Sequence, residues 1–225
     1  MDLRKLREIN IRETKQKVKD SVTDDLILIQ GVHAYNELIR VESRLLNVLK
    51  EWYGYYFPEL TEKDNFPELI PESKNVLMKK FGIKETMGSD LSDNDVKTIK
   101  DFSKQISELK KSRISIEDYI SIKMKKIAPE LYKTATSIVG ARLIERAGSL
   151  KHLAELPSST IQILGAEKSL FRHLRQKTKP PKYGVIFFHP DLVKAKQDEK
   201  GKAARKLAAR ISIAVKQDYF RNERH

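Results

Sequence analysis

The sequence contains no cysteine among its 225 residues, and only one tryptophan. It can therefore form neither a disulfide nor a thiolate metal site, and a reducing compartment is the simplest setting for it. No apolar run approaches the roughly 20 residues that a membrane-spanning helix needs. The charged N-terminus, MDLRKLREIN, also lacks the apolar core of a signal peptide. We expect a soluble protein with no membrane partner.

Groupings of residues typical of enzymes are also missing. The histidines are His33, His152, His173, His189 and His225. None stands at metal-ligand spacing from another histidine or from a pair of carboxylates, and Gly165 is not part of a glycine-rich nucleotide loop. We expect no catalytic residue, no metal and no cofactor. A basic nuclease or RNA-modifying enzyme is the alternative class, and Mg²⁺-dependent activity that follows the pure protein would support it.

Positive charge is abundant and unevenly distributed. The formal net charge is +13. Residues 1–127 hold 24 Lys and Arg against 22 Asp and Glu, whereas residues 128–225 hold 20 against 9. An excess of this size favours a polyanionic partner, most often nucleic acid. The first part is therefore interpreted as a balanced scaffold and the second as the part that meets the polyanion.

Helical periodicity runs through nearly the whole chain, so the predicted fold class is all-α. Residues 1–25 are polar and predict a linking helix. Residues 26–127 predict an antiparallel two-helix coiled-coil domain, with a tip subdomain near 58–94 where Pro, Gly, Ser and Asp gather. The return helix is expected to start near Asp93 or Asp95. The break at Ala128-Pro129 opens a compact helical domain over residues 128–225.

The first long helix carries a wide apolar face. A two-helix hairpin can rarely bury so wide a face alone, so we predict self-association through it, with an intramolecular core as the alternative. The predicted dimerisation residues are Val32, Tyr35, Ile39, Leu46, Leu49 and Tyr53. A second stripe beside them consists of Leu38, Val41, Leu45, Val48 and Trp52.

Three basic segments in the second half form a candidate RNA-binding surface. Its residues are Lys168, Arg172, Arg175, Lys179, Lys182, Lys202, Arg205 and Arg210. On a helix over 161–175 with a distortion at Gly165, the first three share one face, while Leu170, Phe171 and Leu174 are expected to pack inward. Pro180-Pro181 stiffens the segment that follows. Solvated helix faces are the alternative interpretation, but three cationic elements in one half favour phosphate binding.

Four stretches resemble one known family, the Nop family. LPSSTIQILGAEKSLFRHLRQKTKPPKYGVIF resembles the Nop domain signature, and KAARKLAARISIAVKQDYF the segment after it. EWYGYYFPEL resembles the motif at the tip of the family's coiled coil. APELYKTATSIVGARLIERAGSLKHLAELP resembles the entry into the Nop domain, with Glu130 where Asn is commoner. The resemblance covers almost the whole chain.

The resemblance implies a non-catalytic scaffold of a box C/D ribonucleoprotein that guides 2′-O-methylation of ribosomal RNA. It implies an all-α coiled-coil domain followed by a Nop domain, and a coiled-coil homodimer in archaea. It also implies binding to a kink-turn of the guide RNA together with a ribosomal-protein-like kink-turn binding protein. The residues expected at the junction of RNA and that protein are Gly165, Ala166, Glu167 and His173.

Two departures from the family pattern bear on partners and source. Family members normally carry an N-terminal α/β domain that binds fibrillarin before the segment equivalent to residues 3–22, so this is either a truncated or a natural short form. Fibrillarin is expected to bind full-length relatives and is not assured for this chain. The missing Lys/Glu-rich tail favours an archaeal source and a cytoplasmic location, or a nucleolar one in a eukaryote. Alternatives are a spliceosomal-type Nop protein binding small nuclear RNA, and a coiled-coil adaptor without RNA contact.

Overall fold

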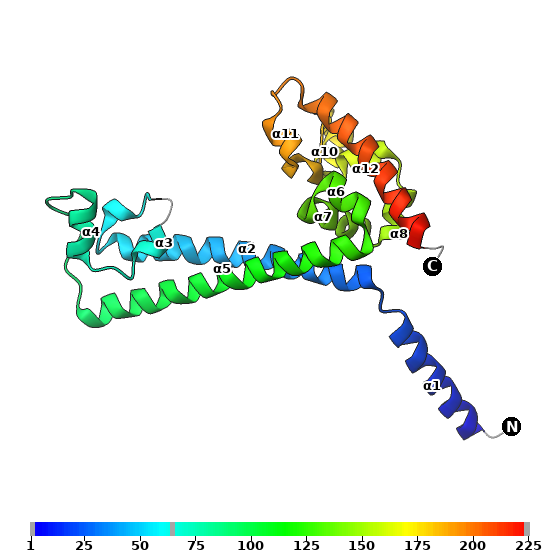
Figure 1. The fold of residues 1–225 in the computed structure, drawn as a ribbon, viewed down its shortest axis with the longest axis horizontal. Helices are drawn as coiled ribbons and strands as arrows, with labels where there is room; N and C mark the ends of the chain where they lie inside the picture. The colour runs from blue at the N-terminus through cyan, green and yellow to red at the C-terminus, as the bar shows by residue number, and fades with distance from the viewer. Residues whose placement is uncertain (1–2, 64–65, 223–225) are drawn as a thin grey trace. The chain divides into compact units, whose positions relative to one another are not determined.

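The computed structural model describes residues 3–63 and 66–222, which form helices and turns, with no strand among these residues (Figure 1). The all-α prediction is confirmed. The chain divides into two compact units. The first comprises Ala34–Ile116, and the second combines the residues up to His33 with those from Glu117 onward. These units do not coincide with the predicted division at residue 128.

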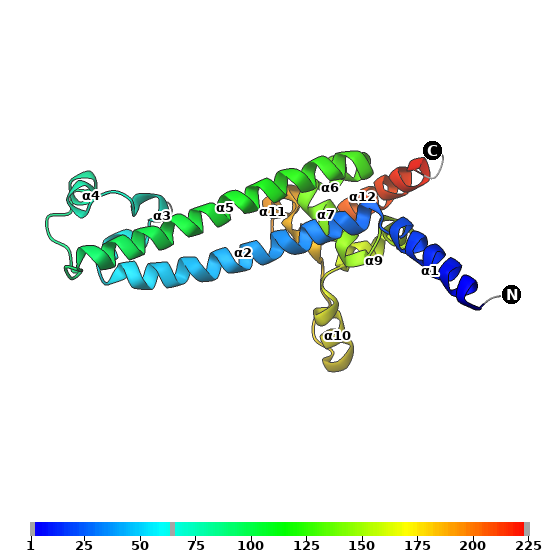
Figure 2. The same cartoon turned by 90° about the horizontal axis from the view of Figure 1, so that it is seen from below.

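The hairpin unit, Ala34–Ile116, contains most of two long helices and the tip between them. Helices α2 (Asp24–Gly54) and α5 (Asp93–Ile127) run side by side and antiparallel (Figures 1 and 2). Between them lie η1 (Pro58–Leu60), α3 (Phe66–Leu69) and α4 (Lys74–Phe81). The start of α5 and the position of the tip subdomain match the sequence prediction.

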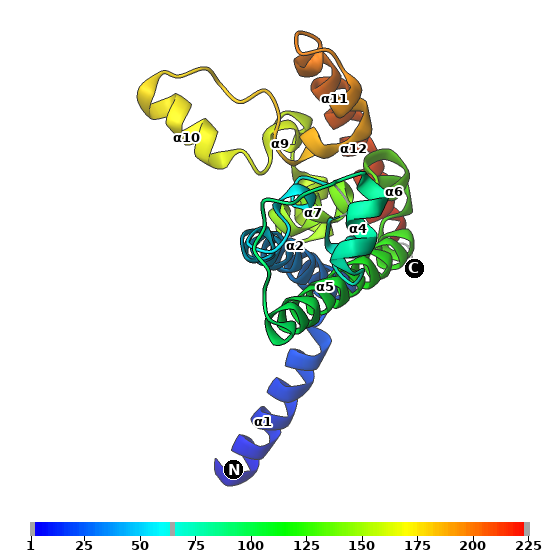
Figure 3. The same ribbon diagram turned by 90° about the vertical axis from the view of Figure 1, so that its left-hand side faces the viewer.

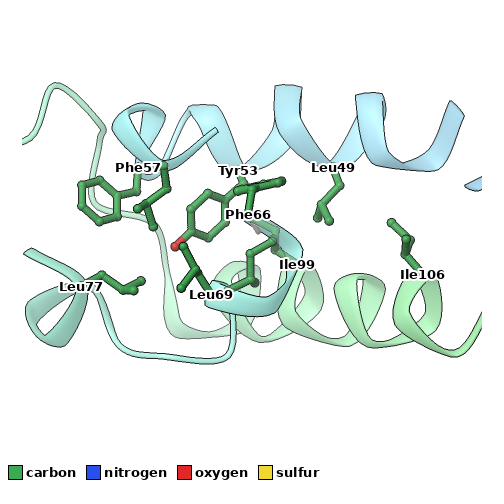
Figure 4. Close-up of a cluster of buried hydrophobic side chains, with 10 residues drawn as sticks. Leu49, Tyr53, Phe57, Phe66, Leu69, Leu77, Ile99 and Ile106 are labelled. Atoms are coloured by element: carbon green, nitrogen blue, oxygen red, sulfur yellow. The ribbon is translucent and has the colours of Figure 1, made fainter. Parts of the chain in front are cut away.

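The core of the hairpin unit joins both long helices to the tip (Figure 4). Its buried members are Leu49, Tyr53, Phe57, Leu60, Phe66, Leu69, Ile70, Leu77, Ile99 and Ile106. The tip loop is fixed by Glu59, whose carboxylate accepts hydrogen bonds from the Met87 N–H and the Thr86 hydroxyl, both at 2.8 Å. The tip is therefore a folded part of this unit.

Most of the predicted dimerisation residues are covered within the single chain. Val32, Tyr35, Leu49 and Tyr53 are between 0% and 8% exposed, and Ile39 and Leu46 are half-buried. In the second stripe, Val41 is 40% and Val48 is 50% exposed, whereas Leu38, Leu45 and Trp52 are half-buried. Helical periodicity does not report which side chains the chain itself covers, and self-association through α2 stays a prediction.

The second unit holds the ends of both long helices against the C-terminal helices. Asp25 accepts a hydrogen bond from the Leu150 N–H at 3.1 Å, and Asp24 pairs with Lys123 at 2.7 Å and with Lys126 at 3.0 Å. These contacts explain why the compact units divide inside α2 and α5. This unit also holds α1 (Leu3–Asp20). None of the residues of this helix is buried.

The C-terminal helices pack around one long helix, α12 (Lys200–Asn222). The others are α6 (Pro129–Ala135), α7 (Ser137–Ala147), α8 (Leu150–Glu155), α9 (Ser158–Ile163), α10 (Glu167–Gln176), η2 (Val185–Phe188) and α11 (Pro190–Lys194). Helix α12 packs against α6, α8 and α9. Leu207, Ile211 and Ala214 lie on its buried face, while Ala203 is half-buried.

A buried carboxylate ties α12 to the start of α6. Asp218 is fully buried and accepts hydrogen bonds from the backbone N–H groups of Glu130 (3.1 Å) and Leu131 (2.8 Å). It thus satisfies donors that the first turn of a helix leaves open. Burial raises the pKa of Asp218 above its usual value, although these two N–H groups and Arg221 oppose the shift. The capping fixes the chain at the predicted break after Ala128.

Candidate nucleic-acid interface

Residues 165–183 leave the body of the second unit and return to it as an arm, made of α10 and the segment that follows (Figures 2 and 3). Backbone hydrogen bonds close its base. The Gly184 N–H donates to the carbonyl of Gln162 at 2.9 Å, and the Val185 N–H donates to that of Leu164 at 2.8 Å. The two ends of the arm are therefore held together, and the arm leaves from a fixed point.

Two glycines make this base possible. Gly165 has φ +88°, a left-handed conformation, and a Cβ there would lie 2.6 Å from a methyl carbon of Val185. A Cβ on Gly184 would lie 2.0 Å from the carbonyl oxygen of Leu164. The distortion predicted at Gly165 is confirmed, and it separates α9 from α10 completely.

The first turn of α10 is held by its own acid. The Gly165 N–H donates to the Glu167 carboxylate at 2.6 Å, and the Ala166 N–H donates to the Ile163 carbonyl at 2.9 Å. Three of the four predicted junction residues, Gly165, Ala166 and Glu167, therefore lie together at the point where α10 begins. The N-cap of α9 is Pro157, so residues 158–160 lie within the helix and their hydroxyls do not cap it.

The arm presents its cations to solvent. Its exposed basic residues include Lys168, Arg172, Arg175, Lys179 and Lys182. The predicted inward packing of the apolar face is wrong, because Phe171 is 59% and Leu174 is 66% exposed. None of the residues of α10, all of which are described, is buried. The arm carries the helix away from the body, so no neighbouring element covers its second face.

The fourth predicted junction residue, His173, closes the far end of α10. Its Nδ1 makes a hydrogen bond with the carbonyl oxygen of Thr178, and because a carbonyl only accepts, Nδ1 is the donor. Between them Lys177 takes the left-handed conformation, with φ 51°, which ends the helix. His173 is therefore a structural part of this turn, separate from the first turn of α10.

Helix α12 supplies the third basic element. Lys202, Arg205 and Arg210 are all exposed. Arg210 is also ion-paired, with one guanidinium nitrogen 3.0 Å from the Asp191 carboxylate. Asp191 lies on α11, and its encounter with α12 depends on tertiary packing that helical periodicity does not report. The phosphate-binding role of Lys202, Arg205 and Arg210 stays a prediction.

Sequence reasoning also missed His189. This side chain is 7% exposed, and its Nδ1 accepts a hydrogen bond from the Asp191 N–H at 3.2 Å, which caps α11. Burial lowers the pKa of His189 below its usual value. The carboxylate of Asp191 opposes that shift and Arg210 adds to it. The His-Pro-Asp sequence was a usable signal, because proline is favoured at the first position of a helix and directly follows the capping residue.

In the part of the chain that the structure describes, no group of three His, Asp, Glu or Cys residues is placed to hold a metal ion. Nor is any helix in this part both long and apolar enough to cross a membrane. The fifth histidine of the sequence analysis, His225, lies outside the described residues.

Comparisons with known proteins point to one family. Residues 36–225 match the model of the Nop family, described as "snoRNA binding domain, fibrillarin". An uncharacterised NOP5 family protein of Methanocaldococcus jannaschii is 36% identical, over 92% of this chain and 55% of that protein. Nucleolar protein 58 of Lodderomyces elongisporus is 37% identical, over 89% of this chain and 43% of that protein. The chain thus spans about half the length of these relatives.

One solved structure, of a fibrillarin/NOP5P complex, is also similar in sequence. It is 30% identical, covers 87% of this chain and 68% of that chain, and has a TM-score of 0.45.

Proposed function

Because the chain belongs to the Nop family, we propose that it is a non-catalytic RNA-binding scaffold of a box C/D ribonucleoprotein. It binds a kink-turn of the guide RNA together with a kink-turn binding protein, and the assembled particle directs 2′-O-methylation of ribosomal RNA. The observation that carries this proposal is the arm, which holds exposed cations on a base fixed by backbone hydrogen bonds.

Phosphate binding follows from the chemistry of the arm. Arg172 and Arg175 can each grip phosphate oxygens with two N–H groups, and Lys168 supplies a compact charge beside them. These contacts position the protein on RNA and read no bases, so selectivity comes from the shape of the folded RNA. The two ends of the arm are held together, and Pro180-Pro181 stiffens the segment that leads back to the body. Such an arm loses less conformational entropy on binding than a flexible tail would.

The kink-turn protein is proposed to meet the RNA at the start of α10. There Gly165, Ala166 and Glu167 form a turn fixed by two hydrogen bonds. The exposed Phe171 and Leu174 give α10 an apolar face beside its basic one. A helix with both faces open suits a composite surface, with phosphates on one side and apolar contacts on the other.

Two further partners belong to the proposal. The chain self-associates through the face of α2 on which Val41 and Val48 are exposed. Fibrillarin, which the description of the family names, performs the methyl transfer in the assembled particle. The archaeal and fungal relatives are 36% and 37% identical, so identity does not separate an archaeal cytoplasmic particle from a nucleolar one.

The test is a mobility shift on a kink-turn RNA, with and without its kink-turn protein, across a salt series. The parent chain is expected to bind only the preformed RNA–protein complex. Lys168→Ala with Arg172→Ala should weaken binding and flatten the slope of log affinity against log salt by about two, roughly one for each lost phosphate contact.

Lys15→Ala with Lys19→Ala is the matched control. It removes two exposed lysines with the same spacing, but from α1. The control should keep the parent slope. Equal binding to any RNA would reduce the chain to a generic basic protein. An unchanged salt slope in the arm variant would contradict the assignment of Lys168 and Arg172 to phosphate binding.

A further inference from the structure

Three aromatic rings lie where the arm rejoins the body, and we call Tyr183, Phe187 and Phe188 the aromatic step. The first two rings stack with centroids 5.0 Å apart and planes 15° apart. Phe188 meets Phe187 edge-on at 5.7 Å and is 61% exposed. The neighbouring Ile186 is fully buried and anchors η2, so the packing of η2 does not depend on the outer face of Phe188.

Cations surround this step. The Lys200 ammonium lies 5.0 Å from the centroid of Phe187, and the Arg142 guanidinium lies 5.4 Å from that of Phe188. Both contacts are within the range of cation–π attraction, so the two rings are held in place by charge as well as by packing. Tyr183 lies between Lys182 and Gly184 at the base of the arm.

We propose that the exposed face of Phe188 stacks an unpaired base of the bound RNA, while the neighbouring cations face the phosphates beside that base. An aromatic face with positive charge beside it matches a nucleotide, which joins a flat base to an anion. An apolar protein surface would have to cover the Lys200 ammonium beside Phe187 without pairing it, which is costly. The inference rests on the proposed function, because it assumes that RNA occupies the arm.

The aromatic step adds something that the basic patch cannot supply. Lysine and arginine bind phosphate on paired and unpaired RNA alike, whereas a stacking ring needs a base that is free of its helix. Stacking also tolerates any base, because each has a π-face. Phe188 therefore makes the interface selective for an unpaired nucleotide at one position, without selecting which base it is.

The probe is a kink-turn RNA bound to its kink-turn protein, in which each unpaired nucleotide is replaced in turn by an abasic residue. Phe188→Ala should weaken binding about fivefold to a hundredfold with the salt slope unchanged, because the ring carries no charge. Phe188→Tyr should bind like the parent, and Phe188→Leu should bind like the alanine variant. One abasic position should weaken the parent chain but have little further effect on Phe188→Ala.

Phe220→Ala is the control, since Phe220 is 56% exposed near the other end of α12 and should bind as the parent does. Leucine binding as well as phenylalanine would overturn the inference in favour of an apolar protein contact. Parent-like binding by Phe188→Ala, with an altered salt slope in the Lys168/Arg172 variant, would overturn the stacking and leave the proposed function standing. Loss of selective binding by the parent would instead reject the proposed function.

Discussion

The imidazole of His189 is buried at the start of α11, where its Nδ1 accepts the Asp191 N–H. Burial lowers the pKa of His189 in the folded chain, so the unfolded chain takes up a proton at a higher pH than the folded one does. The stability that this residue contributes is therefore complete above about pH 6.5 and is lost as the pH falls through the folded pKa. The loss cannot exceed about 1.4 kcal/mol for each pH unit.

His189→Asn should reduce that pH dependence. Asparagine keeps an acceptor for the Asp191 N–H but cannot take up a proton. The free energy of unfolding, measured by urea denaturation at pH 7.5 and 5.5, should fall less between the two values than in the parent. His152→Asn is the control, because His152 is exposed on α8. An asparagine variant as acid-sensitive as the parent would show that other groups carry the effect.

Individual cations were predictable from the sequence, but their pairing was not. Helical spacing placed Lys168, Arg172 and Arg175 on one face, and all three are exposed. Spacing also placed Arg210 among the cations of α12, where the structure adds an ion pair with Asp191. That acid is nineteen residues away in sequence. Its position depends on how α11 folds back, which no local pattern encodes.

At the scale of elements, α10 shows where amphipathic patterns stop being informative. The pattern correctly separates an apolar from a basic face, but it assumes that a body exists to cover the apolar one. Phe171 and Leu174 stay exposed because the arm leaves the body at Gly165. Caps and breakers were more reliable guides. Gly148 ends α7 in the left-handed conformation, and Ala128-Pro129 separates α5 from α6, the second as predicted.

The arm should be removable without unfolding the rest of the chain. Replacing residues 167–181 by Gly-Gly-Ser-Gly keeps Ala166 and Lys182, whose backbone groups bond to the body. The linker has only a short distance to bridge, because the two ends of the arm lie side by side. A Cβ on Gly165 would lie 3.5 Å from the backbone nitrogen of Val185. Since α10 has no buried residue, the melting temperature should change by no more than about 4 °C, while binding to the kink-turn complex is lost.

Circular dichroism melting and the mobility shift together test the role of the arm. A large fall in melting temperature would mean that the arm supports the core. Undiminished RNA binding would mean that α12 and the aromatic step suffice without the arm. The Lys15/Lys19 double variant is again the control for both measurements.

At the scale of the whole molecule, the uneven charge does not mark the boundaries of the compact units. The net charge of +2 over residues 1–127 and of +11 over residues 128–225 separates a balanced hairpin from a basic domain. The compact units instead divide at His33 and Glu117. The ends of the hairpin belong with the basic domain because Asp25 caps the first turn of α8 through the Leu150 N–H. Long-range capping of this kind leaves no trace in composition.

The structure changes which residues test self-association. Aspartate at Leu49, which is fully buried, would unfold the hairpin unit, and a lost dimer would then say nothing about its surface. Val41→Asp with Val48→Asp alters exposed positions, so the monomer should keep its fold while a dimer would have to bury two unpaired carboxylates. Association measured by sedimentation equilibrium should weaken about a hundredfold or more. Val76→Asp, at a 52% exposed position on α4, should leave it unchanged. A dimer that survives the double aspartate would place the contact on another face of the hairpin.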